Sequence, residues 1–213
     1  MMTTSPAIST TGMTRSTATD GPTPLDDPRF NRWEGRLFGG LVLAAFFLYG
    51  IGSALVDEPV GVALVAVNSL AVTIVGMIGF RLLRRSNFWV GTGYLATRLA
   101  EAILLGGGVA LYSFADRSDA DITGYLLAML TLGIGSLPFW HVVGRSPWLS
   151  TRFVLWGMVG YLALAIGAAI ELTTGWEVTY FFAAPGGLFE IAVGVHLLRR
   201  GFGTTNHTGR TER

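Results

Sequence analysis

Residues 88–114 read FWVGTGYLATRLAEAILLGGGVALYSF, an apolar stretch whose only charged residues are Arg98 and Glu101. A helix of this length crosses the hydrocarbon core of a bilayer. Five further apolar runs, each roughly 18–27 residues long, have the same character: Leu37–Val56, Pro59–Phe80, Ile122–Val143, Phe153–Ile170 and Tyr180–Leu198. The sequence therefore predicts an all-α fold, a polytopic membrane bundle of six transmembrane helices.

The composition supports this prediction. Hydrophobic residues make up 51% of the chain and charged residues only 14%, whereas a water-soluble domain has about 25% charged residues. Cysteine is absent, which excludes disulfides, thiolate metal sites and cysteine nucleophiles.

The arginines indicate how the bundle is oriented. All 15 basic residues are Arg. Thirteen of them precede the first run, follow the last run, or lie in every second gap between runs. Arg117 lies in the opposite set of gaps, and Arg98 lies inside a run. Positive charge collects on the cytoplasmic side of multi-pass proteins, so we expect both termini to be cytoplasmic in a cell membrane, with the lipid bilayer as partner. The opposite gaps carry acidic residues: Asp57, Glu58, Asp116, Asp119, Asp121, Glu171 and Glu177.

The chain divides into three parts. Residues 1–30 are rich in Thr, Ser and Pro without an apolar period, which predicts a disordered tail. Residues 31–202 form the predicted six-helix transmembrane domain, and residues 203–213 form a second disordered tail. Aromatic residues, favoured at headgroup level, mark the two expected interfaces: Trp33, Trp89, Trp140 and Trp148 on the cytoplasmic side, and Tyr112, Trp176 and Tyr180 on the other.

Three ionisable residues fall inside the runs: Arg98, Glu101 and Glu190. Charge at this depth is costly unless it is paired or reaches water. Arg98 and Glu101 are three residues apart and share a helix face, with Tyr94 and Thr97 on much the same side as secondary candidates. This polar stripe must face the interior of the bundle.

Depth arithmetic supplies a partner for Arg98. Counted from the cytoplasmic ends of their runs at 1.5 Å per residue, Arg98 lies roughly 15 Å deep, Glu101 roughly 20 Å and Glu190 roughly 12 Å. We therefore expect an Arg98–Glu190 ion pair between the third and sixth spans, with Glu101 close by. One cation between two carboxyl groups also calls for a proton, a polar partner or water.

The sixth span carries Ala183-Ala-Pro185-Gly-Gly187 just before Glu190. Proline removes a backbone donor and glycine weakens a helix, so this segment predicts an irregular or kinked beginning. Gly186, Gly187 and Gly194 share the face of Glu190, where small residues allow close helix packing. Packing and a transporter-like kink both fit this pattern.

No catalytic or metal signature is complete. His141 and His196 lie near cytoplasmic helix ends, where they fit headgroup contacts. Two His with no third clear ligand make a poor zinc set, and Glu190 is six residues from His196, which does not place the two on one helix face. No Ser/His/Asp set lies at one depth. We therefore expect no catalytic residues, no metal, no cofactor and no nucleic-acid partner, and no enzymatic role.

Three segments resemble the domain of unknown function 4386 family of six-span membrane proteins. They are Gly93-Tyr-Leu-Ala-Thr-Arg98-Leu-Ala-Glu101-Ala, Arg145-Ser-Pro-Trp148-Leu-Ser, and Ala184-Pro-Gly-Gly-Leu-Phe-Glu190-Ile ending at Arg200-Gly-Phe202. The resemblance covers roughly Arg36 to Phe202. It implies that Arg98, Glu101 and Glu190 occupy the family's polar positions, and an aromatic residue where this chain has His196. It implies no reaction.

Two functional interpretations remain for the Arg98, Glu101 and Glu190 cluster. One is a structural clamp that fixes two helices in a membrane protein without catalytic role. The other is the site of a small-solute or proton-coupled transporter, because charges near the bilayer midplane recur in carriers. An intramembrane enzyme acting on lipid ranks last. A cavity that reaches Glu190 would favour transport, and a dry Arg98–Glu190 pair would favour the clamp.

Overall fold

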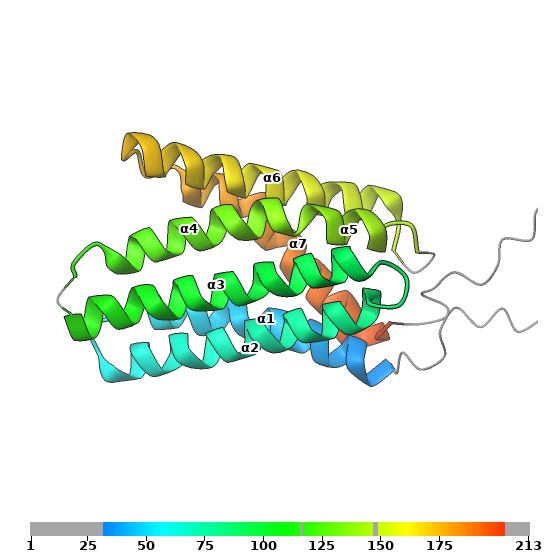
Figure 1. Cartoon of the computed structure of the whole chain (residues 1–213), viewed down its shortest axis with the longest axis horizontal. Coiled ribbons are helices and arrows are strands. Elements are labelled where there is room, and N and C mark those ends of the chain that lie inside the picture. The colour runs from blue at the N-terminus through cyan, green and yellow to red at the C-terminus, as the bar shows by residue number, and fades with distance from the viewer. Residues whose placement is uncertain (1–31, 116, 147–148, 203–213) are drawn as a thin grey trace, which may run out of the picture.

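The computed structural model describes residues 32–115, 117–146 and 149–202, which form antiparallel helices joined by short turns (Figure 1). The tails predicted at residues 1–30 and 203–213 lie outside the described residues. The helices are α1 (Arg32–Ala54), α2 (Pro59–Leu83), α3 (Phe88–Ala115), α4 (Ala120–Gly135), α5 (Leu137–Val143), α6 (Thr151–Thr174) and α7 (Thr179–Arg200). With α4 and α5 taken together, six helical spans are long and apolar enough to cross a membrane.

The six spans form a closed ring. Each packs against the next in the order α1, α2, α3, α4, α6, α7, and α7 returns to α1. The start of α1 and the end of α7 lie at one end of this ring, together with the α2–α3 and α5–α6 connections (Figure 1). We call this the arginine end, and it carries Arg32, Arg84, Arg85, Arg145, Arg152, Arg199 and Arg200. The other end, the acidic end, carries Asp57, Glu58, Asp119, Asp121 and Glu177.

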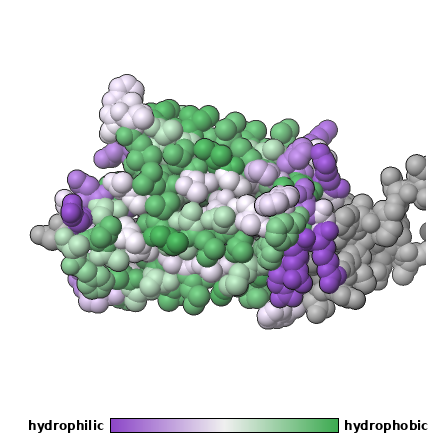
Figure 2. Space-filling view, in the orientation of Figure 1, coloured by the Kyte–Doolittle hydropathy of each residue, from purple (hydrophilic) through white to green (hydrophobic). Residues whose placement is uncertain are grey.

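An apolar belt surrounds the ring between these two ends. Figure 2 shows hydrophobic side chains across the middle of the molecule and hydrophilic ones gathered at the ends. Large apolar side chains point outward along the helices: Phe47 is 61% exposed, Leu70 61% and Ile103 70%. An exposed apolar surface this extensive is typical of a protein that contacts lipid.

The predicted fourth run is divided in the structure. The helix changes at Ser136, and α5 begins with Leu137-Pro138. Pro138 has no backbone N–H and occupies the first turn of a helix, where that donor is not needed. The sequence predicted one helix over this run, and α4 and α5 together still have the length and hydropathy of one span.

Glu171 was predicted to lie in a gap between apolar runs, and that prediction was wrong. It lies inside α6 and is 7% exposed, and its Oε2 accepts a 2.9 Å hydrogen bond from the backbone N–H of Thr179. Thr179 is the first residue of α7, whose opening N–H groups have no partner within the helix. The carboxylate therefore caps α7 from the neighbouring helix, where negative charge is also favoured by the helix dipole. Asp121, also placed in a gap, lies in the first turn of α4.

The predicted irregular beginning of the sixth span is absent from the described structure, because α7 is helical from Thr179 onward with Pro185 inside it. The glycines serve close packing. Gly186 faces Gly160 on α6, and Gly194 faces Leu43 on α1. These contacts support the packing interpretation, and a kink at Pro185 within the helix stays a prediction.

The tightly packed core lies in the arginine half of the ring. Tyr94 and Phe139 stack with ring centroids 3.8 Å apart, and Trp140 packs edge-on against Phe139 and Phe189. Trp140 is only 2% exposed, so its predicted place at the membrane interface was wrong. It belongs to the core because its helix turns this face inward, towards α6 and α7.

Candidate functional site

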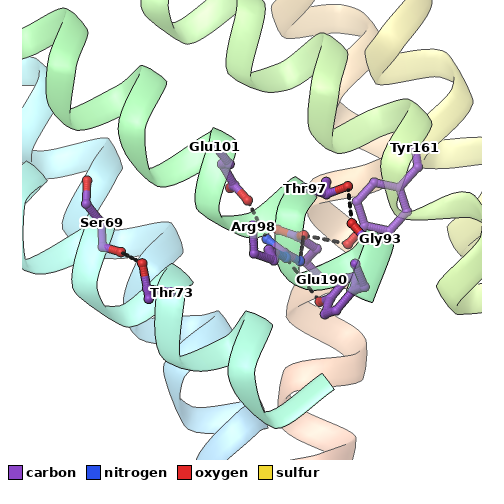
Figure 3. A network of polar contacts seen from close by, with 9 residues as sticks. Ser69, Thr73, Gly93, Thr97, Arg98, Glu101, Tyr161 and Glu190 are labelled. Atoms are coloured by element: carbon purple, nitrogen blue, oxygen red, sulfur yellow. Dashed lines mark hydrogen bonds and ion pairs between the residues drawn. The ribbon is translucent and has the colours of Figure 1, made fainter. Parts of the chain in front are cut away.

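The three charged residues predicted to cluster do meet inside the ring. Figure 3 shows Arg98 and Glu101 on α3 and Glu190 on α7 directed towards one another. Nη1 of Arg98 donates to Oε2 of Glu101 over 2.9 Å, and Nη2 lies 3.6 Å from Oε1 of Glu190. The predicted contact between the third and sixth spans is thus confirmed, and the shorter of the two ion pairs is the one within α3.

Burial differs across the cluster. The side chains of Arg98 and Glu101 are 5% and 6% exposed, whereas that of Glu190 is 20% exposed. A buried guanidinium needs its charge compensated and its N–H groups bonded. Arg98 meets both needs through Glu101 and through Tyr94, whose hydroxyl accepts a 3.0 Å hydrogen bond from Nε. Arg98 is therefore held firmly within α3, and Glu190 contacts it from the side.

Tyr161 is a member of the cluster that the sequence analysis missed. Its hydroxyl, on α6, donates a 2.6 Å hydrogen bond to Oε1 of Glu190, and the residue is 1% exposed. A signal was present, because Tyr161 comes ten residues after the start of α6 and Arg98 ten residues after the start of α3, so both lie about 15 Å into the ring. The cost of burying charge singles out Arg98, Glu101 and Glu190, and a neutral phenol on another helix carries no such cost.

The two secondary candidates on α3 behave differently. Tyr94 joins the cluster through its hydroxyl and closes one side of it through its ring stack on Phe139. The hydroxyl of Thr97 donates to the carbonyl of Gly93 in its own helix, over 2.9 Å. The hydroxyl of Thr97 is therefore hydrogen-bonded within its own helix, as threonine hydroxyls often are. This hydrogen bond does not involve the charged groups.

His196 lies away from the cluster. Its ring is 6.4 Å from that of Phe153, and it lines a shallow depression on α7 with Arg199 and Arg200. Among residues 32–115, 117–146 and 149–202, no group of three or more His, Asp or Glu side chains is placed to hold a metal ion.

A cavity of about 870 Å³ occupies the acidic half of the ring. By helix register, Ser53, Asp121 and Tyr180 lie at the acidic end of its lining, and Arg98, Glu101, Tyr161 and Glu190 lie about midway along the ring. The aromatic core lies between this cluster and the arginine end. The charged cluster therefore forms the inner part of the cavity wall, and the lining also includes residues exposed on the outer face, such as Phe46 and Leu188.

Asn68 is a second polar group that the sequence analysis missed. It lies on α2, is 1% exposed and lines the cavity. Neither its Nδ2 nor its Oδ1 has a hydrogen-bond partner among the described residues. An unpaired buried amide costs about 1–3 kcal/mol, and none of the described residues offsets that cost for Asn68. An asparagine within the apolar run Pro59–Phe80 was the available signal.

No protein-family model, curated protein or solved structure matches this chain. The resemblance to the 4386 family stays a prediction, and the site is interpreted from its own geometry.

Proposed function

We propose that this chain is a multi-pass integral membrane protein of the cell membrane, with both termini on the cytoplasmic side. The apolar belt (Figure 2) supports a bilayer around the ring. The arginine-rich connections all lie at the end that holds both ends of the helical domain, which the positive-inside rule assigns to the cytoplasm. The cavity then opens to the outside.

We infer that the protein has no catalytic role and binds a small solute in this cavity, as a transporter. The observation that carries this inference is the cavity that descends from the acidic end to Arg98, Glu101 and Glu190. Charged groups at the floor of a pocket inside a transmembrane bundle are the usual arrangement of a carrier's substrate site.

The geometry of Glu190 favours a site over a clamp. A clamp between helices would hold the pair dry and at hydrogen-bond distance, because that geometry offsets the desolvation of two charges. Glu190 instead lines the cavity, is the most exposed member of the cluster, and lies 3.6 Å from Nη2 of Arg98. Its Oε1 accepts a hydrogen bond from Tyr161, whereas Oε2 takes part in neither of these contacts and is available to a ligand.

The packed half of the ring closes the cavity on the side opposite to the acidic end, as transport requires. An alternating-access carrier exposes its site to one side while the other side is closed. Here the stack of Tyr94 on Phe139 and the contacts of Trp140 close the path to the arginine end. The ring thus corresponds to an outward-facing state.

Thiol labelling tests the proposed cavity, because the chain has no cysteine of its own. Ala183, on the cavity wall, and Ala128, which is 0% exposed and not part of that wall, are each replaced by Cys. In lipid nanodiscs, Ala183→Cys should react with small methanethiosulfonates much faster than Ala128→Cys. Equal, slow reaction of both variants would rule out an open cavity and with it the proposed function.

A further inference from the structure

We propose that the solute bound in the central cavity is an organic cation, a protonated amine that carries an apolar body. This inference rests on the proposed function and specifies its substrate class. Its evidence is the charge of the lining, the carboxylate oxygens of Glu101 and Glu190 that no hydrogen bond or ion pair among the described residues uses, and the aromatic mouth.

The lining has an excess of negative charge. Glu101, Glu190 and Asp121 line the cavity, and Arg98 is the sole basic side chain among the described residues of its wall. Even with one proton shared between Glu101 and Glu190, carboxylate outnumbers guanidinium. A cavity of one sign concentrates solutes of the opposite sign, so the pocket favours cations and repels anions.

Arg98 is a poor site for an anion. Nε is bonded to Tyr94, Nη1 to Glu101, and Nη2 faces Glu190 at 3.6 Å. A ligand carboxylate at Nη2 would lie beside the like charge of Glu190, which is unfavourable in the interior. By contrast, Oε1 of Glu101 and Oε2 of Glu190 take no part in these contacts and remain as acceptors for a donor that enters from the cavity.

Asn68 adds a buried amide to the α2 wall of the same cavity, and neither of its side-chain atoms has a partner among the residues described. Both atoms are shielded from solvent, so the acceptors that face the cavity are those of Glu101 and Glu190. An ammonium group carries up to three donors, so one bound cation can bond to carboxylates from both α3 and α7.

The mouth of the cavity is aromatic and acidic. Tyr49 and Tyr125 stack with centroids 5.6 Å apart, and Tyr125 and Tyr180 with centroids 6.3 Å apart. All three line the cavity beside Asp121. Aromatic faces attract ammonium groups, so the mouth offers a first binding position on the way to the floor.

The remaining wall defines the body of the ligand. Beside the charged groups the cavity is lined by aliphatic side chains, Val72, Val75, Leu105, Met129, Leu132 and Leu164. Apolar walls with a few polar groups are typical of small-molecule sites. An amine with a hydrocarbon or aromatic body would bury that body here.

Charge-selective labelling of the same pocket is the test. The full chain carrying Ala183→Cys, in nanodiscs, is treated with a trimethylammonium methanethiosulfonate or with its sulfonate counterpart. The rates are divided by those of Ser118→Cys, an exposed position at the same end of the molecule, which removes the intrinsic difference between the reagents. We expect the cationic reagent to be preferred by about tenfold or more, the preference to fall in a Glu101→Gln/Glu190→Gln background, and 2-phenylethylammonium to protect the thiol where 3-phenylpropionate does not.

The outcomes separate the two proposals. Equal normalised rates, or a preference for the sulfonate, would overturn the cation assignment while the open cavity stands. No reaction above that of Ala128→Cys would overturn the cavity and the cation together. Ala45→Cys, on the α1 wall of the same cavity, repeats the measurement if Ala183→Cys does not give a folded, monodisperse protein.

Discussion

The hydroxyl of Tyr161 on α6 donates a 2.6 Å hydrogen bond to Oε1 of Glu190 on α7, the same carboxylate oxygen that faces Arg98 on α3. A single oxygen thereby joins three helices of the ring at one depth. Figure 3 shows the three side chains converging at this point. The position of Glu190 is consequently set by a neutral donor as well as by the guanidinium.

Tyr161→Phe tests the first of these contacts. Loss of a hydrogen bond to a charged group should lower the free energy of unfolding by about 1.5–3 kcal/mol, measured by thermal or denaturant unfolding in detergent. Tyr180→Phe, at a position 67% exposed, is the matched control and should change little. Equal stability of both variants would show that the Tyr161 bond does not hold α6 to α7.

Glu190→Gln distinguishes the solute site from the clamp. An amide oxygen still accepts from Tyr161, and Arg98 keeps Glu101, so the free energy of unfolding should fall by less than about 1 kcal/mol. A clamp predicts a loss of about 3–5 kcal/mol on removal of one buried partner. A loss in that range would refute the interpretation of Glu190 as a ligand group.

Arg98→Met should be far more damaging than Glu190→Gln. It leaves Glu101, 5% exposed, without its counter-charge, at a cost of about 3–5 kcal/mol. The double variant Arg98→Met/Glu101→Gln removes both charges and should recover much of that loss in the same unfolding assay. If the double variant is as unstable as Arg98→Met, the loss of the counter-charge of Glu101 is not what destabilises Arg98→Met.

Gly160→Ala should weaken the α6–α7 interface. A Cβ at this position would lie 2.7 Å from the Cα of Gly186, so the two helices must separate, at about 1–3 kcal/mol. Gly107→Ala is the control, because a Cβ there meets nothing within 4 Å and alanine favours the helix. Unfolding midpoints of the two variants should therefore move in opposite directions, and a shared direction would contradict the packing argument.

Single cysteines test the orientation of the ring. A membrane-impermeant maleimide added to intact cells should label Ser118→Cys, at the acidic end, and not Ser86→Cys, at the arginine end. Ser86→Cys should react once the cells are made permeable. The reverse pattern would place the cavity on the cytoplasmic side.

The sequence predicted the helices well because a bilayer imposes a simple rule. Each span must be long, apolar and internally hydrogen-bonded, and such a run is visible without knowledge of its neighbours. Helix ends were less predictable. Glu171 was placed in a gap because it is charged and near a helix end, whereas the structure uses it inside α6 to cap α7. Which charge caps which helix depends on the neighbour across the interface.

The Arg98–Glu190 contact was predictable for a related reason. Depth along a transmembrane helix is one coordinate, and it can be counted from sequence when the helix ends are known. The depths of Tyr161 and Asn68 can be counted in the same way. Their neutral side chains, however, carry no large desolvation cost that would single them out among the many polar residues in spans.

What the sequence by itself determined is the set of apolar helices, the bias of arginine to one end and the depth of each buried charge. The tertiary structure alone decided that the spans close into a ring, that aromatic side chains fill one half of it, and that a cavity of about 870 Å³ remains in the other. The reason is physical. Length, hydropathy and charge are properties of each segment, whereas a cavity exists only through the relative placement of six segments and the volume that their side chains leave unfilled.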